Sequence, residues 1–122
     1  MRVLAVDDSV SIRELVRLVL QATEGVSLVE TADSVDQALS IIQSQPFDLF
    51  IIDWYMQPKS GAILLKEIKA QTQFNHIPVI VLSADQDPQA KALAKRLGAI
   101  GWMTKPFNPK RLQELVLSYK VG

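Results

Sequence analysis

The sequence predicts an α/β fold in which helices cover both faces of a parallel sheet. Strand and helix signals alternate five times along the 122 residues, and strict alternation is typical of parallel sheets built from β/α units. Three of the five strand segments are continuously apolar, as expected for strands buried on both faces. No linker, repeat or low-complexity segment interrupts the pattern, so we expect one domain over residues 1–122.

The first β/α unit begins with a short apolar strand over residues 3–6. A helix follows, because apolar residues recur at helical spacing, and Gly25 is a plausible stop at its end. The residues of this stripe are Ile12, Leu15, Val16, Val19 and Leu20. Residues 27–31 then mix polar and apolar side chains, which favours a strand at the edge of the sheet.

The second helix begins at a capping-box signal, Ser34 to Gln37, and Pro46 closes it. Residues 49–52 form the next continuously apolar strand. A third helix is indicated by the apolar stripe Leu64, Leu65 and Ile68.

The last two units repeat one helix-start signal. Residues 87–88 (Asp-Pro) and 108–109 (Asn-Pro) each place a capping residue before a proline suited to the first helical position. Gly98 stands where a helix-ending glycine belongs. Residues 79–82 are a third continuously apolar strand, whereas the fifth strand, at residues 100–103, is less apolar and is expected at the other edge.

Composition excludes several kinds of site and partner. Thirteen basic and thirteen acidic residues cancel, and no basic stripe or polybasic run predicts binding to nucleic acid or to a membrane. The chain has no cysteine, which excludes disulfides and thiolate chemistry, and its one histidine cannot form a multi-histidine metal site. No apolar run approaches the roughly 20 residues of a membrane span, and the N-terminus lacks a signal-peptide layout. We therefore expect a cytoplasmic protein.

Polar residues stand where the predicted strands end. Asp7 and Asp8 follow the first strand, Asp53 the third, Ser83 the fourth and Lys105 the fifth. In open sheets of this kind, ligands bind beyond the carboxyl ends of the strands. These five side chains should therefore converge on one site.

Three converging carboxylates repel one another, and a hard divalent cation relieves that repulsion. Mg²⁺ fits best, since proteins hold it with one or two carboxylates, waters and a phosphate. An aspartate can also be a nucleophile that forms an aspartyl phosphate. Asp53, on a central strand, is the candidate.

The segments AVDDS, FIIDWYM, VLSA and TKPF carry a family resemblance. In this order and spacing they resemble the receiver domain of two-component response regulators of the CheY type, over nearly the whole chain. The resemblance implies a doubly wound (βα)5 fold with strand order 2-1-3-4-5, of which CheY is a known example. It implies a switch phosphorylated by a sensor histidine kinase or a histidine phosphotransfer protein. Such a domain catalyses only its own phosphotransfer and dephosphorylation.

The resemblance also implies residue roles at the acidic site. Asp53 would be the phosphoacceptor. Mg²⁺ would be held by Asp7, Asp8, Asp53 and the backbone carbonyl of Tyr55. Trp54, beside Asp53, is expected at the rim of the site.

The remaining implied roles concern the switch. Ser83 would bond to the phosphoryl oxygens, Lys105 would pair with them, and the Lys105–Pro106 peptide bond would be cis. Movement of Ser83 would free space for Trp102, at the switch aromatic position, to turn inward. The surface of the fourth helix, fifth strand and fifth helix would then change, and a downstream target or output domain would recognise it.

Two other functions stay open. A pseudo-receiver would keep the fold and bind partners without switching, and Trp102, in place of the usual tyrosine or phenylalanine, leaves a version of that open. The other is a Mg²⁺-dependent phosphohydrolase with an aspartate nucleophile. Haloacid-dehalogenase-like phosphatases commonly carry a second aspartate two residues after the nucleophile, where this chain has Tyr55.

Overall fold

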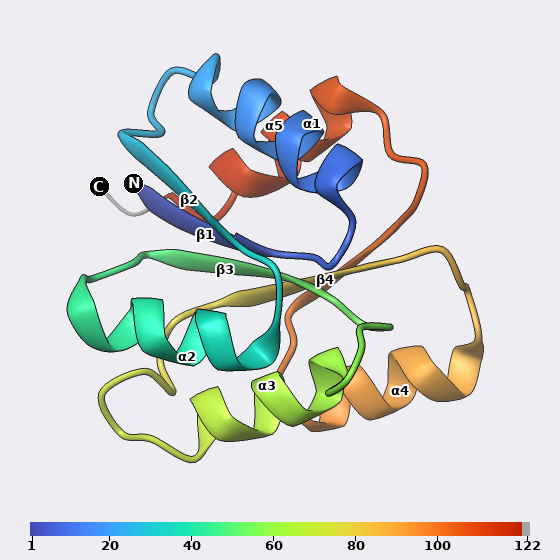
Figure 1. Ribbon diagram of the computed structural model, residues 1–122. Coiled ribbons are helices and arrows are strands. Elements are labelled where there is room, and N and C mark those ends of the chain that lie inside the picture. Colours follow the sequence, from blue (N-terminus) through green and yellow to red (C-terminus); the bar gives the residue numbers. More distant parts are fainter. Residues whose placement is uncertain (121–122) are drawn as a thin grey trace.

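The computed structural model describes residues 1–120, in which strands and helices alternate throughout (Figure 1). The strands are β1 (Arg2–Val6), β2 (Leu28–Ala32), β3 (Leu49–Asp53), β4 (Val79–Ser83) and β5 (Gly101–Thr104). The helices are α1 (Val10–Gln21), α2 (Val35–Ser44), α3 (Gly61–Lys69), α4 (Pro88–Arg96) and α5 (Pro109–Leu117). Within residues 1–120, none of the helices combines the length and hydrophobicity that a bilayer crossing requires.

All five strands pair in parallel in the order β2-β1-β3-β4-β5. This confirms the predicted fold class, the strand order and the edge positions of β2 and β5. The register pairs Val6 with Ile52, Asp53 with Leu82, and Ser83 with Thr104. The carboxyl ends of β1, β3, β4 and β5 therefore lie along one edge of the sheet.

The sheet lies between two layers of helices (Figure 1), with one apolar core on each side of it. Helices α1 and α5 cover one face, and α2, α3 and α4 cover the other. Alternate side chains of β3 pack into the two cores. Phe50 and Ile52 face α2 to α4, whereas Leu49 and Ile51 face α1 and α5. This double burial explains why β3 is a continuous apolar run rather than an alternating one.

All five strands differ by one residue from the predicted bounds. β2 and β5 begin and end one residue later than predicted, β1 begins one residue earlier, and β3 and β4 extend to Asp53 and Ser83. Asp53 belongs to the strand because its neighbour continues the ladder, with the Trp54 N–H donating to the Leu82 carbonyl at 3.0 Å. The candidate phosphoacceptor is thus fixed by sheet hydrogen bonds rather than carried on a loop.

The predicted helix signals are mostly confirmed. Ser34 Oγ accepts the Gln37 N–H at 3.2 Å, but the Gln37 side chain reaches the Asp33 N–H at 2.6 Å instead of the Ser34 N–H of a standard capping box. Gly98, with φ of 112°, follows the end of α4 as predicted. Gly25 was expected as the stop of α1, but α1 already ends at Gln21 and Gly25 lies in the turn beyond.

The cap of α5 gives a first testable expectation. Asn108 Oδ1 accepts the backbone N–H groups of Lys110 and Arg111, at 2.9 and 3.4 Å. Asn108→Ala should lower the free energy of unfolding by about 1 kcal/mol, because both groups lose their side-chain acceptor. Urea unfolding measures this, and Asn108→Asp, which keeps an acceptor, should be near wild type. Equal losses in both variants would contradict the capping role.

Candidate functional site

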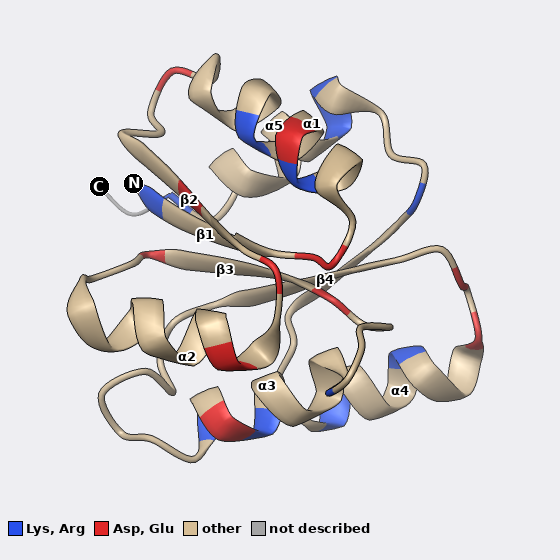
Figure 2. Ribbon diagram, in the orientation of Figure 1, with Lys and Arg blue, Asp and Glu red and all other residues tan. Residues whose placement is uncertain are grey.

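Three carboxylates meet at the carboxyl edge of the sheet. Asp7 and Asp8 follow β1, and Asp53 ends the adjacent strand β3; Figure 2 shows these acidic segments at the same edge. One carboxylate oxygen from each residue lies within 4.8 Å of the others. Asp7 and Asp53 are buried, whereas Asp8 is exposed. The cluster is therefore an oxygen-rich group, open on one side, that could hold a hard divalent cation.

Lys105, in the segment between β5 and α5, joins this cluster. Its Nζ lies 2.6 Å from Asp7 Oδ2 and 3.3 Å from Asp53 Oδ1. Its backbone N–H donates to the Ser83 carbonyl at 2.7 Å, and the peptide bond to Pro106 is cis. One ammonium group thus faces two buried carboxylates.

The single lysine does not fully compensate the buried charge. The pKa of Asp53 is raised from its ordinary 3.8 to about 6: burial raises it most, the negative charges of Asp7 and Asp8 also raise it, and Lys105 partly offsets these effects. The ionised carboxylate of Asp53 is thus held in a high-energy state. A further positive charge beside it would be favourable, and a divalent cation among the three acids would supply that charge.

Ser83 is the last residue of β4, next to the strand that ends in Asp53. Its side chain is fully buried, and its Oγ accepts the backbone N–H of Asp85 at 3.1 Å. The structure therefore places the predicted hydroxyl at the same edge as the acids.

The loop after Asp53 is held close to its strand. The Gly61 N–H donates to the Trp54 carbonyl at 2.9 Å, and a Cβ added to Gly61 would stand 2.2 Å from the Asp53 carbonyl oxygen. Only glycine fits at that distance. The loop exposes Tyr55, whose hydroxyl donates to Asp85 Oδ2 at 3.0 Å. That hydrogen bond raises the pKa of Tyr55 above its ordinary 10.0, and the protonated phenol is the donor.

The two tryptophans pack together. Their ring centroids lie 5.9 Å apart and the rings are tilted by 54°. Trp54 was expected at the rim of the site, but only 6% of it is exposed because it packs into the core beside Trp102. Among residues 1–120, the buried Nε1 of Trp102 has no hydrogen-bond partner. Sequence reasoning missed this pairing, since the two residues lie on different elements and share no spacing signal.

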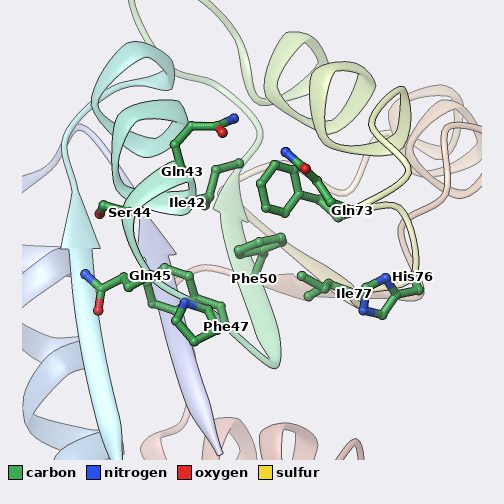
Figure 3. A pocket seen from close by; sticks show the side chains of 11 residues that line it. Ile42, Gln43, Ser44, Gln45, Phe47, Phe50, Gln73, His76 and Ile77 are labelled. Atoms are coloured by element: carbon green, nitrogen blue, oxygen red, sulfur yellow. The ribbon is translucent and has the colours of Figure 1, made fainter.

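A cavity of about 490 Å³ lies at the opposite edge of the sheet, where β3 and β4 begin (Figure 3). Phe47, Phe50 and Ile77 form its apolar part, and neutral amides such as Gln43 and Gln73 lie around it. It contains no carboxylate, lysine or arginine. This cavity therefore lacks the carboxylates and the lysine that gather at the carboxyl edge.

Known proteins resemble this chain over almost its whole length. Residues 3–117 match the response regulator receiver domain family. Chemotaxis protein CheY-3 of Vibrio cholerae is 32% identical, covering 93% of this chain and 87% of that protein. The solved structure of chemotaxis protein CheY4 of Vibrio cholerae, crystallised at low pH, matches with a TM-score of 0.91 and 37% identity, covering 97% of each chain.

Longer regulators match as well. The phosphate regulon transcriptional regulatory protein PhoB of Escherichia coli is 34% identical, covering 91% of this chain and 48% of PhoB. The chain spans about half the length of the regulators of this kind that it matches.

Proposed function

Since this chain belongs to the response regulator receiver domain family, a signalling module of two-component systems, we propose that it is switched by phosphorylation of Asp53. Receiver domains interact with histidine kinases and downstream effectors. We propose a sensor histidine kinase or a histidine phosphotransfer protein as the donor. The observation that carries the proposal is the meeting of Asp53 with Asp7, Asp8 and Lys105 at one edge of the sheet.

The proposed transfer is a nucleophilic displacement at phosphorus. An oxygen of the Asp53 carboxylate forms the new P–O bond while the P–N bond to the donor histidine breaks, and the imidazole leaves with the electron pair and takes up a proton. The raised pKa of Asp53 shows that its negative charge is poorly stabilised before transfer. Lys105 would pair with the phosphoryl oxygens, and Ser83 would donate its hydroxyl to them.

The metal proposed for this site is Mg²⁺. Asp7, Asp8, Asp53 and the backbone carbonyl of Tyr55 would hold it, and the three acids offer the oxygen ligands that it prefers. When bound, it would neutralise negative charge on the phosphoryl group during transfer. The same residues would support slow hydrolysis of the aspartyl phosphate, so the chain would act on its own modification rather than turn over an external substrate.

The proposed output surface is the face made by α4, β5 and α5. Ile100 is 48% exposed there, and a cavity of about 530 Å³ between α4 and β5 has Lys91, Ala94 and Trp102 among its lining. Trp102 lies between this surface and the core, so rotation of its ring would change the shape that a downstream target meets. We also propose that residues 1–122 form one receiver domain that acts in the cytoplasm.

The direct test is to incubate the chain with a small acyl phosphate, with and without Mg²⁺, and to measure its intact mass. We expect a gain of one phosphoryl group that a chelator prevents. No gain, with Mg²⁺ binding retained in calorimetry, would support the pseudo-receiver. Steady turnover of a generic phosphoester would support the phosphohydrolase.

A further inference from the structure

Asp85 connects three parts of the carboxyl edge, two adjacent to it in sequence and one 30 residues away. Its backbone N–H donates to Ser83 Oγ at 3.1 Å. Its Oδ1 accepts the Asp87 N–H at 2.9 Å, at the start of α4, and its Oδ2 accepts the Tyr55 hydroxyl at 3.0 Å. One residue thus joins the end of β4, the cap of α4 and the loop that follows Asp53.

These bonds have a defined effect on the Ser83 hydroxyl. Because Ser83 Oγ accepts from the Asp85 N–H, its own proton is directed elsewhere and stays available as a donor. A phosphoryl oxygen on Asp53, at the end of the adjacent strand, is an acceptor for that proton. The position of the Asp85 backbone therefore sets where the serine hydroxyl points.

Local turn structure explains two of the hydrogen bonds of Asp85 but not its bond to Tyr55. The bonds from Asp85 to Ser83 and Asp87 span two residues each and are ordinary turn interactions. The bond to Tyr55 joins residues 30 apart, between neighbouring loops. Tyr55 is 51% exposed, so its ring does little for the core, and its hydroxyl gives the segment that carries Asp85 a hydrogen bond to another loop.

We propose that Tyr55 and Asp85 are positioning residues for phosphoryl transfer. The Tyr55 hydroxyl anchors the Asp85 carboxylate, and the Asp85 amide in turn holds Ser83 Oγ ready to donate to the phosphoryl group. The inference rests on the proposed function of Asp53 and adds two residues that would affect the rate of phosphoryl transfer to it. The role proposed for Tyr55 belongs to its side chain, because substitution of Tyr55 leaves its backbone carbonyl in place.

The test compares rates of phosphoryl uptake from a small acyl phosphate in Mg²⁺. Tyr55→Phe should be roughly three- to tenfold slower than wild type, the usual value of one hydrogen bond expressed as a rate. Asp85→Ala should be at least as slow, and adding Tyr55→Phe to it should have no further effect. In a Ser83→Ala background, Tyr55→Phe should change nothing, because the residue acts through Ser83.

Tyr119→Phe is the matched control, since Tyr119 is the other tyrosine of the chain and its hydroxyl makes only a 3.4 Å contact with the Ile100 carbonyl. It should behave as wild type. An independent readout is the exchange rate of the Asp85 amide proton in the unphosphorylated protein, measured by NMR. That proton should exchange faster in Tyr55→Phe and at the wild-type rate in Tyr119→Phe.

The proposed function and the positioning role of Tyr55 and Asp85 can be overturned separately. A wild-type chain that takes up no phosphoryl group overturns the proposed function, and this inference with it. Uptake in wild type with an equal rate in Tyr55→Phe, or with unchanged exchange of the Asp85 amide, overturns the positioning role alone. Faster uptake in Tyr55→Phe would also overturn it, because the hydrogen bond would then restrain transfer.

Discussion

The Asp53→Asn chain is expected to take up no phosphoryl group from an acyl phosphate in Mg²⁺. An amide is a far weaker nucleophile than a carboxylate, and the substitution also removes a charge from the proposed metal site. Uptake should fall at least about a hundredfold, since loss of a nucleophile costs more than loss of a group that orients it. Intact mass after a fixed incubation measures this. The side-chain shape is nearly conserved, so folding is expected to persist.

The matched control for this experiment is Asp36→Asn. Asp36 is an aspartate on α2 whose side chain is 73% exposed and pairs with Lys59, and it is not one of the three clustered acids. Its uptake should equal that of wild type. If Asp53→Asn still gained one phosphoryl group, another acid would be the acceptor, and mapping of the modified peptide would show whether it is Asp7 or Asp8.

The fold was predictable because its main signals are local. The continuous apolar runs of β1, β3 and β4 follow from burial on both faces, and the mixed composition of β2 and β5 follows from their edge positions. Strand ends were less predictable, since the inclusion of Asp53 in β3 depends on its pairing with Leu82. Pairing partners far apart in sequence leave no periodic pattern.

The candidate site was predictable in part for the same reason. Parallel strands bring their carboxyl ends together whatever the loops do, so the meeting of Asp7, Asp53 and Lys105 follows from topology. The bond between Tyr55 and Asp85 could not be predicted, because it depends on the paths of two loops.

Asp53 should also control how stability depends on pH in metal-free buffer. Its pKa in the folded protein is about 6, above its ordinary 3.8. Between these values the folded state binds more protons than the unfolded state, so Asp53 lowers stability as pH rises. Below about pH 4 the folded and unfolded states are both protonated at Asp53, and above about pH 6 both are ionised. The loss should therefore fall between pH 4 and 6 and stay constant above.

The matched comparison is Asp53→Asn, which cannot ionise at this position. Urea unfolding at a series of pH values should show the variant close to wild type near pH 4 and more stable by up to about 3 kcal/mol at pH 7, the value of the full pKa difference. If the wild type instead gained stability relative to the variant as pH rose, the ion pair with Lys105 would outweigh the burial of Asp53 and its repulsion by Asp7. In that case Lys105 alone would stabilise the ionised carboxylates, and the physical argument for a cation among the three acids would lose its basis.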